Sequence, residues 1–236
     1  MTIGIVTFCA LAGLIIAALT TSRDKSSPPS AKAEEKIDLD ALKARAERGD
    51  AQAQKDLGKV YSKGQDVPQS YEEAGKWYQL AADKGNAEAQ VALGELYEAG
   101  QGVARDDKEA AKWYRRAADQ GLAAAQYNVA VMYVMGKGVP QSSVEALKWY
   151  RLAADQGDAL AQFNLGMRYY EAKGVVADPI EAYKWLSLAS AQGIPDATRV
   201  RGDLKGKMTS AQVAEAERRV SAFAAKKTVR PLSKSE

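Results

Sequence analysis

The chain has 236 residues, of which 46% are apolar, 27% charged and 8% aromatic, a balance that favours a packed core over wholesale disorder. A formal net charge of only +3 argues against a dedicated nucleic-acid binder. Histidine is absent, which removes the commonest general base near neutral pH and the commonest metal ligand. With Cys9 as the only cysteine, one chain can form neither a disulfide framework nor a cysteine-based zinc site.

The N-terminal region begins with an uncharged, nearly continuous apolar run over residues 3–19. This run has the length of a short membrane-spanning helix and exceeds a typical signal-peptide core. We therefore expect residues 1–22 to form a single-pass anchor, with a cleaved signal peptide as the alternative. The Ser/Pro-rich stretch 23–37 is typical of a flexible linker.

The charges around the apolar run leave the orientation open. Only the amino terminus is positive before the run, whereas Arg23 and Lys25 follow it closely. Taken literally, the positive-inside rule places the C-terminal part in the cytoplasm. Long soluble domains often cross a membrane despite such a weak bias, so this count does not decide the side.

An internal repeat with a period of 36 residues dominates the rest of the chain. Several residue types recur at that spacing without an insertion. The recurring positions are Gly49, Gly85, Gly121, Gly157 and Gly193; Trp77, Trp113, Trp149 and Trp185; Gln54, Gln90, Gln126 and Gln162; Tyr61, Tyr97, Tyr133 and Tyr169; and Ala74, Ala110, Ala146 and Ala182. A fixed period of this length predicts stacked copies of one supersecondary unit.

Each copy contains two helical patterns separated by a loop. In the third copy, Val129, Met132 and Tyr133 have the spacing of one helix face, and a second helix begins at Ser142 or Ser143. Small residues recur in the middle of the first helices, where glycine is unfavourable, and they predict close approach of the second helix. These small residues are Gly58, Gly94, Ala130 and Gly166. We interpret the Trp and Tyr residues of the second helices as core that fills the adjoining layer.

The segments that flank the repeats are predicted to be helical caps. Residues 38–48 are similar to the second helix of a degenerate preceding copy, and Pro195–Ala225 should form one or two further helices. Terminal units of a repeat stack need a polar outer face, which these charged segments supply. The whole segment 194–236 carries ten Lys/Arg against five Asp/Glu. We interpret this excess as a solvated helix face with a basic tail, and a weak contact with an acidic surface is the alternative.

The repeated unit resembles the Sel-1-like repeat, a relative of the tetratricopeptide repeat. Its motif is carried most fully by AEAQVALGELYEAGQGVARDDKEAAKWYRRAADQG, from Ala87 to Gly121, and the resemblance covers 49–193. It implies an all-α, right-handed superhelical solenoid of four helix–turn–helix repeats. Asp66 and Ala172 replace loop glycines of the motif, so we expect those two loops to differ in shape from the others.

Motifs for catalysis are nearly absent from the sequence. It contains no Gly-rich phosphate loop and no nucleophile elbow. Ser22 and Lys25 formally match S-x-x-K, but they fall in the linker, which offers no rigid pocket for a nucleophile. We therefore predict a protein that is not an enzyme, with no catalytic residue, no cofactor and no metal.

The remaining candidate site is the surface lined by the first helices, which stacked repeats curve into a concave face. Residues at the sixth, seventh and tenth positions after each repeat glycine vary between copies, from charged in the first two to apolar and aromatic in the last two. The predicted partner-binding residues are Lys55, Lys59, Glu95, Tyr127, Asn128, Val131, Phe163, Asn164 and Met167. Because aromatic–Asn pairs are common in the motif itself, Tyr127, Asn128, Phe163 and Asn164 have a purely structural alternative.

The resemblance implies a scaffold that binds another protein, and family members are typically bacterial envelope, regulatory or host-interaction proteins. It favours an inner-membrane protein with its repeats in the periplasm, against the charge count. Two alternatives remain. One is a structural or assembly subunit of a membrane complex. The other is a hydrolase of cell-wall or β-lactam substrates, since some relatives have been linked to such binding. Those relatives belong to a cysteine-rich branch of the family with a disulfide in each repeat. This alternative is disfavoured because no repeat of this chain contains a cysteine.

Overall fold

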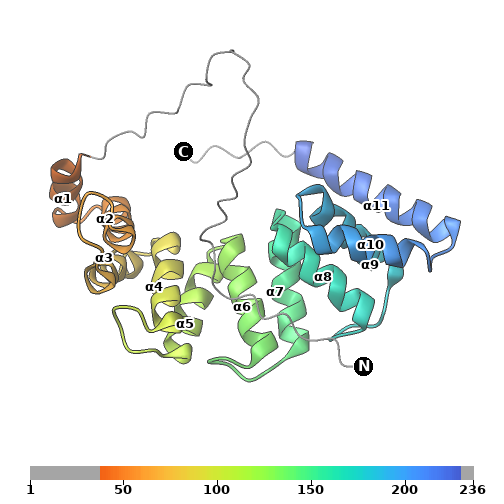
Figure 1. Cartoon of the computed structure of the whole chain (residues 1–236), viewed down its shortest axis with the longest axis horizontal. Coiled ribbons are helices and arrows are strands. Elements are labelled where there is room, and N and C mark those ends of the chain that lie inside the picture. Colours follow the sequence, from red (N-terminus) through yellow and green to blue (C-terminus); the bar gives the residue numbers. More distant parts are fainter. Residues whose placement is uncertain (1–37, 230–236) are drawn as a thin grey trace, which may run out of the picture. The chain divides into compact units, whose positions relative to one another are not determined.

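The computed structural model describes residues 38–229, which belong to one compact unit, Ile37–Glu236. Every regular element in this described part is a helix (Figure 1). The helices are α1 (Leu39–Glu47), α2 (Ala51–Lys63), α3 (Tyr71–Asp83), α4 (Ala87–Ala99), α5 (Asp107–Asp119), α6 (Ala123–Met135), α7 (Ser143–Gln156), α8 (Ala159–Glu171), α9 (Pro179–Ala191), α10 (Pro195–Lys205) and α11 (Ser210–Val229). The predicted anchor and linker, and the last residues of the basic tail, lie outside these residues. None of the helices described is long and apolar enough to cross a membrane.

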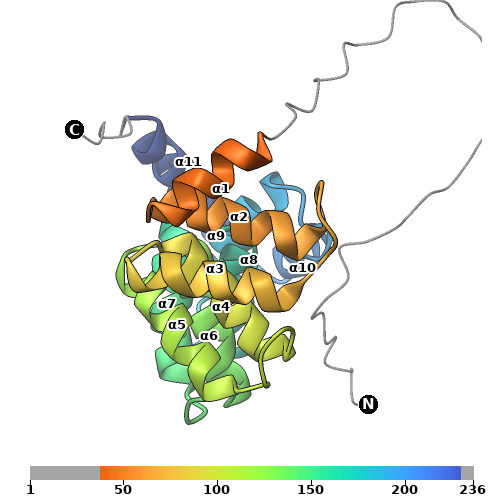
Figure 2. The same cartoon turned by 90° about the vertical axis from the view of Figure 1, so that its left-hand side faces the viewer.

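The helices pack in pairs, and the pairs stack in chain order. We name α2, α4, α6 and α8 the A helices and α3, α5, α7 and α9 the B helices. Each A helix packs on the B helix that follows it, and each B helix also packs on the next A helix. Figure 2 views the same stack from the α1 end. The predicted all-α solenoid of four repeats is therefore confirmed.

Local sequence sets where each helix begins and ends. The B helices start after a side chain that accepts hydrogen bonds from the first free backbone N–H groups. These caps are Ser70, Asp106, Ser142 and Asp178. The A helices end at a residue with left-handed backbone conformation, which glycine adopts at no steric cost. These residues are Gly64, Gly100, Gly136 and, in the fourth repeat, Ala172.

The small residues in the A helices allow the two helices of a repeat to approach closely, as predicted. A Cβ at Gly94 would lie 2.7 Å from Cε1 of Tyr114, which is buried on α5. Gly58 stands in the same relation to Tyr78, and a Cβ at Gly166 would lie 2.9 Å from Cγ of Leu186. Glycine therefore gives the B-helix side chain room to lie against the A-helix backbone.

Buried glutamines join each A helix to the helix before it, which is α1 for α2 and a B helix for the other three. Their Nε2 atoms donate to backbone oxygens 3.0–3.3 Å away, and buried polar groups need such partners. The pairs are Gln54 with Ala46, Gln90 with Ala82, Gln126 with Ala118 and Gln162 with Ala154. In the last three repeats a second glutamine donates to the first at 2.7–2.8 Å. Lys84 takes that place in the first repeat and donates to the Gly49 oxygen instead, so Oε1 of Gln54 has no partner among the described residues.

The loops with Asp66 and Ala172 keep the backbone conformation of the other loops, so the prediction that they differ in shape was wrong. Both residues have left-handed φ values, +58° and +57°. Gly102 has φ +69° at the position of Asp66, and Gly136 has φ +68° at that of Ala172. The reason is that all four loops close with the same two backbone hydrogen bonds. These hydrogen bonds hold even a non-glycine residue in the left-handed region, at a cost of about 1–2 kcal/mol.

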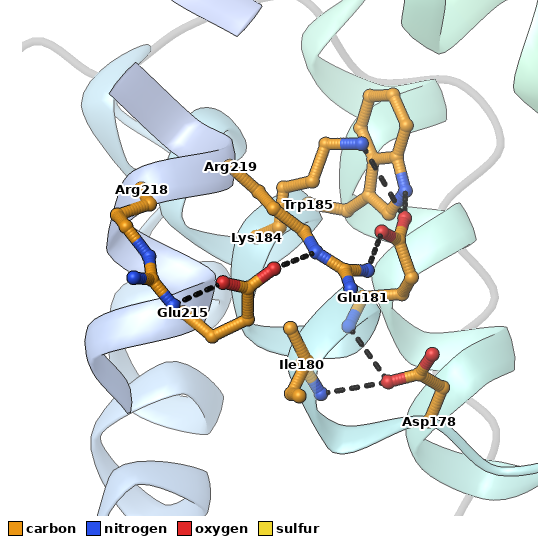
Figure 3. A network of polar contacts seen from close by, with 8 residues as sticks. All are labelled: Asp178, Ile180, Glu181, Lys184, Trp185, Glu215, Arg218 and Arg219. Carbon is orange, nitrogen blue, oxygen red and sulfur yellow. Dashed lines mark hydrogen bonds and ion pairs between the residues drawn. The ribbon is translucent and has the colours of Figure 1, made fainter. Parts of the chain in front are cut away.

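The C-terminal cap is attached to α9 by a partly buried ion-pair network (Figure 3). The Glu181 carboxylate is 15% exposed and accepts hydrogen bonds from Trp185 Nε1 at 3.0 Å and Arg219 at 2.7 Å. Arg219, on α11, also donates to Glu215 at 2.8 Å. Because charge-assisted hydrogen bonds of this kind are strong when partly buried, they fix α11 against α9. The Phe223 ring adds an edge-to-face contact with Trp185 at 5.4 Å.

Helix α10 repeats the A-helix pattern, but no B-helix side chain lies against its glycine. No described atom lies within 4 Å of the place where a Cβ at Gly202 would stand. The exposed residues around it, including Arg199 and Asp203, are charged. The last A-type helix therefore ends the stack with a polar face.

The two glycine environments predict opposite effects of alanine. Gly94→Ala should lower the free energy of unfolding by about 1 kcal/mol or more, because the new methyl group overlaps the Tyr114 ring. Gly202→Ala should raise it by about 0.4–1 kcal/mol, because a helical position without steric contact gains from alanine. Thermal unfolding of the full chain measures both variants, and a shift in the same direction for both would contradict the assignment.

Replacing Ala172 with glycine tests the strain in the fourth loop. Ala172→Gly should stabilise the chain by about 1 kcal/mol, since glycine adopts φ +57° without the Cβ penalty. Gly136→Ala at the equivalent position should destabilise it by a similar amount. The two shifts in Tm should therefore have opposite signs, and a Tm lowered by Ala172→Gly would refute the strain.

Candidate interaction surface

All nine predicted partner-binding residues lie on A helices, and none of them is buried. We call the outward-facing side chains of α2, α4, α6 and α8 the helix-A surface. Lys55 and Lys59 lie on α2 and Glu95 on α4. Helix α6 carries Tyr127, Asn128 and Val131, and α8 carries Phe163, Asn164 and Met167. Equivalent positions of successive repeats thus run across this surface.

At the α2 end the surface is charged, and one of its lysines is already engaged within the chain. Lys55 Nζ lies 2.7 Å from Glu88 and 3.0 Å from Asp56. Partial burial alone would lower the pKa of Lys55, but its hydrogen bonds to Glu88 and Asp56 outweigh that effect and raise the pKa. Lys55 therefore stays charged and joins α2 to α4. Lys59, one turn on, is exposed.

At the α6 and α8 end the surface is apolar. Tyr127, Val131, Phe163 and Met167 pack on the buried core with part of their side chains and expose the rest. Asn164 bonds back to its own helix, with Nδ2 donating to the Leu160 oxygen at 2.9 Å. That bond supports the structural interpretation of Asn164, whereas the apolar residues remain available for contact.

The structure adds two residues to this apolar end that the sequence analysis missed. Met135 on α6 is 43% exposed and Leu160 on α8 is 47% exposed. Each lies one helical turn from a predicted residue on the same face, Val131 and Phe163 respectively. A comparison of the third and fourteenth positions after each repeat glycine would have found them, because the first two repeats carry polar or small residues there.

Between the two ends, α4 carries two glutamates, one with partners inside the chain and one without. Glu98 accepts a hydrogen bond from the Tyr114 hydroxyl at 3.1 Å and pairs with Lys137 at 3.3 Å. Glu95 is exposed and forms no ion pair or hydrogen bond with the described residues. Loss of hydration among the surrounding protein atoms, with repulsion from Glu98, raises the pKa of Glu95. The missing partner and the raised pKa distinguish Glu95 from Glu98.

One charged side chain beneath this surface was also missed. Arg168 on α8 is 7% exposed and stands where the other repeats have Val60, Leu96 and Met132. Its guanidinium lies 5.4 Å from the centre of the Tyr150 ring, and NH1 donates to the Lys173 oxygen at 3.4 Å. Arg168 therefore joins α8 of the fourth repeat to α7 of the third, where cation–π contact replaces aliphatic packing.

Residues 38–229 contain no group of three His, Cys, Asp or Glu side chains that could hold a metal ion. A pocket between α5 and α6, lined in part by Ala111, Val129 and Met132, encloses about 40 Å³. That space admits a few water molecules at most.

Comparison with known proteins agrees with this geometry. The family model described as the Sel1 repeat matches residues 51–86, 87–122, 123–158 and 159–194. A Sel1 repeat protein from Oxalobacter formigenes is 36% identical, with a TM-score of 0.66, over 70% of this chain and 68% of that one. The protective antigen c5321 of uropathogenic Escherichia coli, which displays an SLR fold, is 28% identical, with a TM-score of 0.51. That match covers 83% of this chain but only 52% of the antigen. No curated protein gave a match.

The raised pKa of Glu95 predicts a pH-dependent gain in stability from Glu95→Gln. The folded state holds this proton more tightly than the unfolded state, so ionisation of Glu95 destabilises the fold as pH rises through the folded pKa. The variant should therefore have a higher Tm than the parent at pH 7, and the difference should vanish below the usual Glu value of 4.5.

Glu88→Gln is the matched control for this experiment, because Glu88 is an exposed glutamate on the same helix but is paired with Lys55. The control should not raise the Tm at pH 7. A Glu95→Gln variant that is less stable than the parent at pH 7 would show that the Glu95 carboxylate has a stabilising partner.

Proposed function

The chain belongs to the Sel1 repeat family, and on that premise we propose that it is a non-enzymatic scaffold that binds another protein on the helix-A surface. Repeats of this family typically serve protein–protein interaction. The observation that carries the proposal is the contrast between a constant interior and a changing exterior. Glycine, glutamine and tyrosine contacts recur in the repeats, while the exposed A-helix residues change from charged on α2 to apolar on α6 and α8.

The apolar end gives this surface its binding capacity. Met135 and Leu160 are exposed beside the half-buried Val131, Phe163 and Met167, so several apolar side chains lie on the same faces of α6 and α8. Exposed apolar residues scattered singly need no explanation, but grouped ones mark interaction sites. A partner that covers them gains hydrophobic stabilisation without any change in the repeat stack.

We further propose that residues 1–22 tether this scaffold to the bacterial inner membrane, with the repeats on the periplasmic side. The apolar run over residues 3–19 supports a tether. A structural or assembly subunit of a membrane complex is the second possibility, in which the anchor makes the main contact. The two differ in whether binding survives without the anchor.

Site-specific photo-crosslinking tests the proposed surface with a closely matched control. Leu160 on α8 and Leu152 on α7 are both leucines and both 47% exposed, but only Leu160 lies on the helix-A surface. A benzophenone side chain at position 160 of the full chain, irradiated in intact cells, should give a discrete adduct with another protein, and the same group at position 152 should not. Equal adducts at both positions, or an adduct at 152 alone, would contradict the proposal.

A further inference from the structure

The unpaired carboxylate of Glu95 gives information about the partner. Glu95 lies on α4, between the charged end of the helix-A surface on α2 and its apolar end on α6 and α8. Its carboxyl is exposed and, within residues 38–229, has no ion pair or hydrogen bond. Lys59, the exposed lysine at the equivalent position of the first repeat, forms no ion pair with Glu95. Two further lysines are engaged elsewhere, because Lys55 is paired with Glu88 and Lys137 with Glu98. Neither is free to neutralise Glu95.

The surroundings of Glu95 favour a cation from outside. Glu98, three residues further along α4, adds negative charge, and its own two oxygen atoms already accept from Tyr114 and Lys137. A cation close to a carboxylate favours its ionised form, so a cation placed here would stabilise the unpaired carboxylate. The raised pKa of Glu95 agrees with a carboxyl that lacks such a partner.

The neighbouring apolar residues restrict the ligand further. A metal ion would not use them, and one free carboxylate is too few ligands for a cage. A protein segment can satisfy both features, because an amphipathic segment carries basic and apolar side chains on one face.

Resting on the proposed function, we infer that the partner contributes an amphipathic segment with one arginine or lysine that pairs with Glu95 and with bulky apolar side chains that cover Val131 and Met167. Glu95 sets the position and direction of the segment, and the apolar residues supply most of the affinity. The charge complementarity also selects against acidic segments, because an unpaired second carboxylate beside Glu95 and Glu98 is strongly disfavoured.

A library of random peptides displayed on phage, selected on the full chain, tests this inference even while the partner is unidentified. The enriched peptides should combine a basic residue with apolar residues, and Met167→Glu should abolish their binding. Glu95→Lys should weaken peptide binding by about tenfold or more, and Glu95→Gln should weaken it by less. A peptide with glutamate in place of its basic residue should bind the Glu95→Lys variant more tightly than the parent chain. Glu72→Lys on α3 makes the same change in net charge away from the surface and should leave the affinity unchanged.

The other outcomes contradict the inference, and they show whether the proposed function fails with it. If Met167→Glu abolishes binding but Glu95→Lys has no effect, the proposed function stands and the basic partner residue is wrong. If neither substitution matters, or no peptide is enriched, both fail. Tighter peptide binding after Arg23→Ser and Lys25→Ser would show that the chain's own linker occupies the surface. If the chain self-associates and Glu95→Lys abolishes this self-association, a second copy of the chain occupies the surface.

Discussion

The structure depends above all on how each A helix is fixed between the helix before it and the B helix after it. On one side, glycine in three of the four repeats lets a tyrosine or leucine of the B helix lie against the A-helix backbone, as with Gly94 and Tyr114. The third repeat has Ala130 at this position. On the other side, a buried glutamine donates to the last turn of the preceding helix, as Gln90 does to Ala82. The first contact sets the distance and the second the register. Together they determine which A-helix residues point outward, and therefore which residues a partner can reach.

The residues that hold the stack together recur from repeat to repeat, whereas the residues that a partner can reach differ between repeats. A repeat stack is held by contacts between neighbours, so residues that make none of them can vary at little cost. The outward positions of α2 are used for an internal ion pair, Lys55 with Glu88, whereas those of α6 and α8 stay apolar. Glu95 differs from both, because its exposed carboxyl has no partner among the described residues and its pKa is raised. Groups with a perturbed pKa tend to cluster at functional sites.

The sequence predicted the period, the helix pairs and the close approach at the small residues, because each depends on local spacing that repeats. It predicted wrongly that Asp66 and Ala172 alter their loops, because backbone hydrogen bonds at both ends of a loop outweigh a modest conformational penalty. The glutamines were recognised as recurrent, but their partner is a backbone oxygen, which carries no residue-specific signal.

The sequence predicted which positions form the candidate surface. It did not predict which of their charged side chains form ion pairs within the chain. That Lys55 is engaged and Glu95 is not follows from side chains in neighbouring repeats, which the sequence of one helix does not contain. The burial of Arg168 likewise depends on the Tyr150 ring opposite it. The packing of α11 on α9 depends on the contact between Arg219 and Glu181, which is distant in sequence.

Hydrogen–deuterium exchange of the full chain, with and without a bound peptide, tests the central claim most directly. If the stack fixes the helix-A surface as the binding surface, the peptide should slow exchange in α4, α6 and α8 and leave the outward faces of α5 and α7 unchanged. Slowed exchange confined to the B helices or to α10 and α11 would place binding elsewhere and contradict the account.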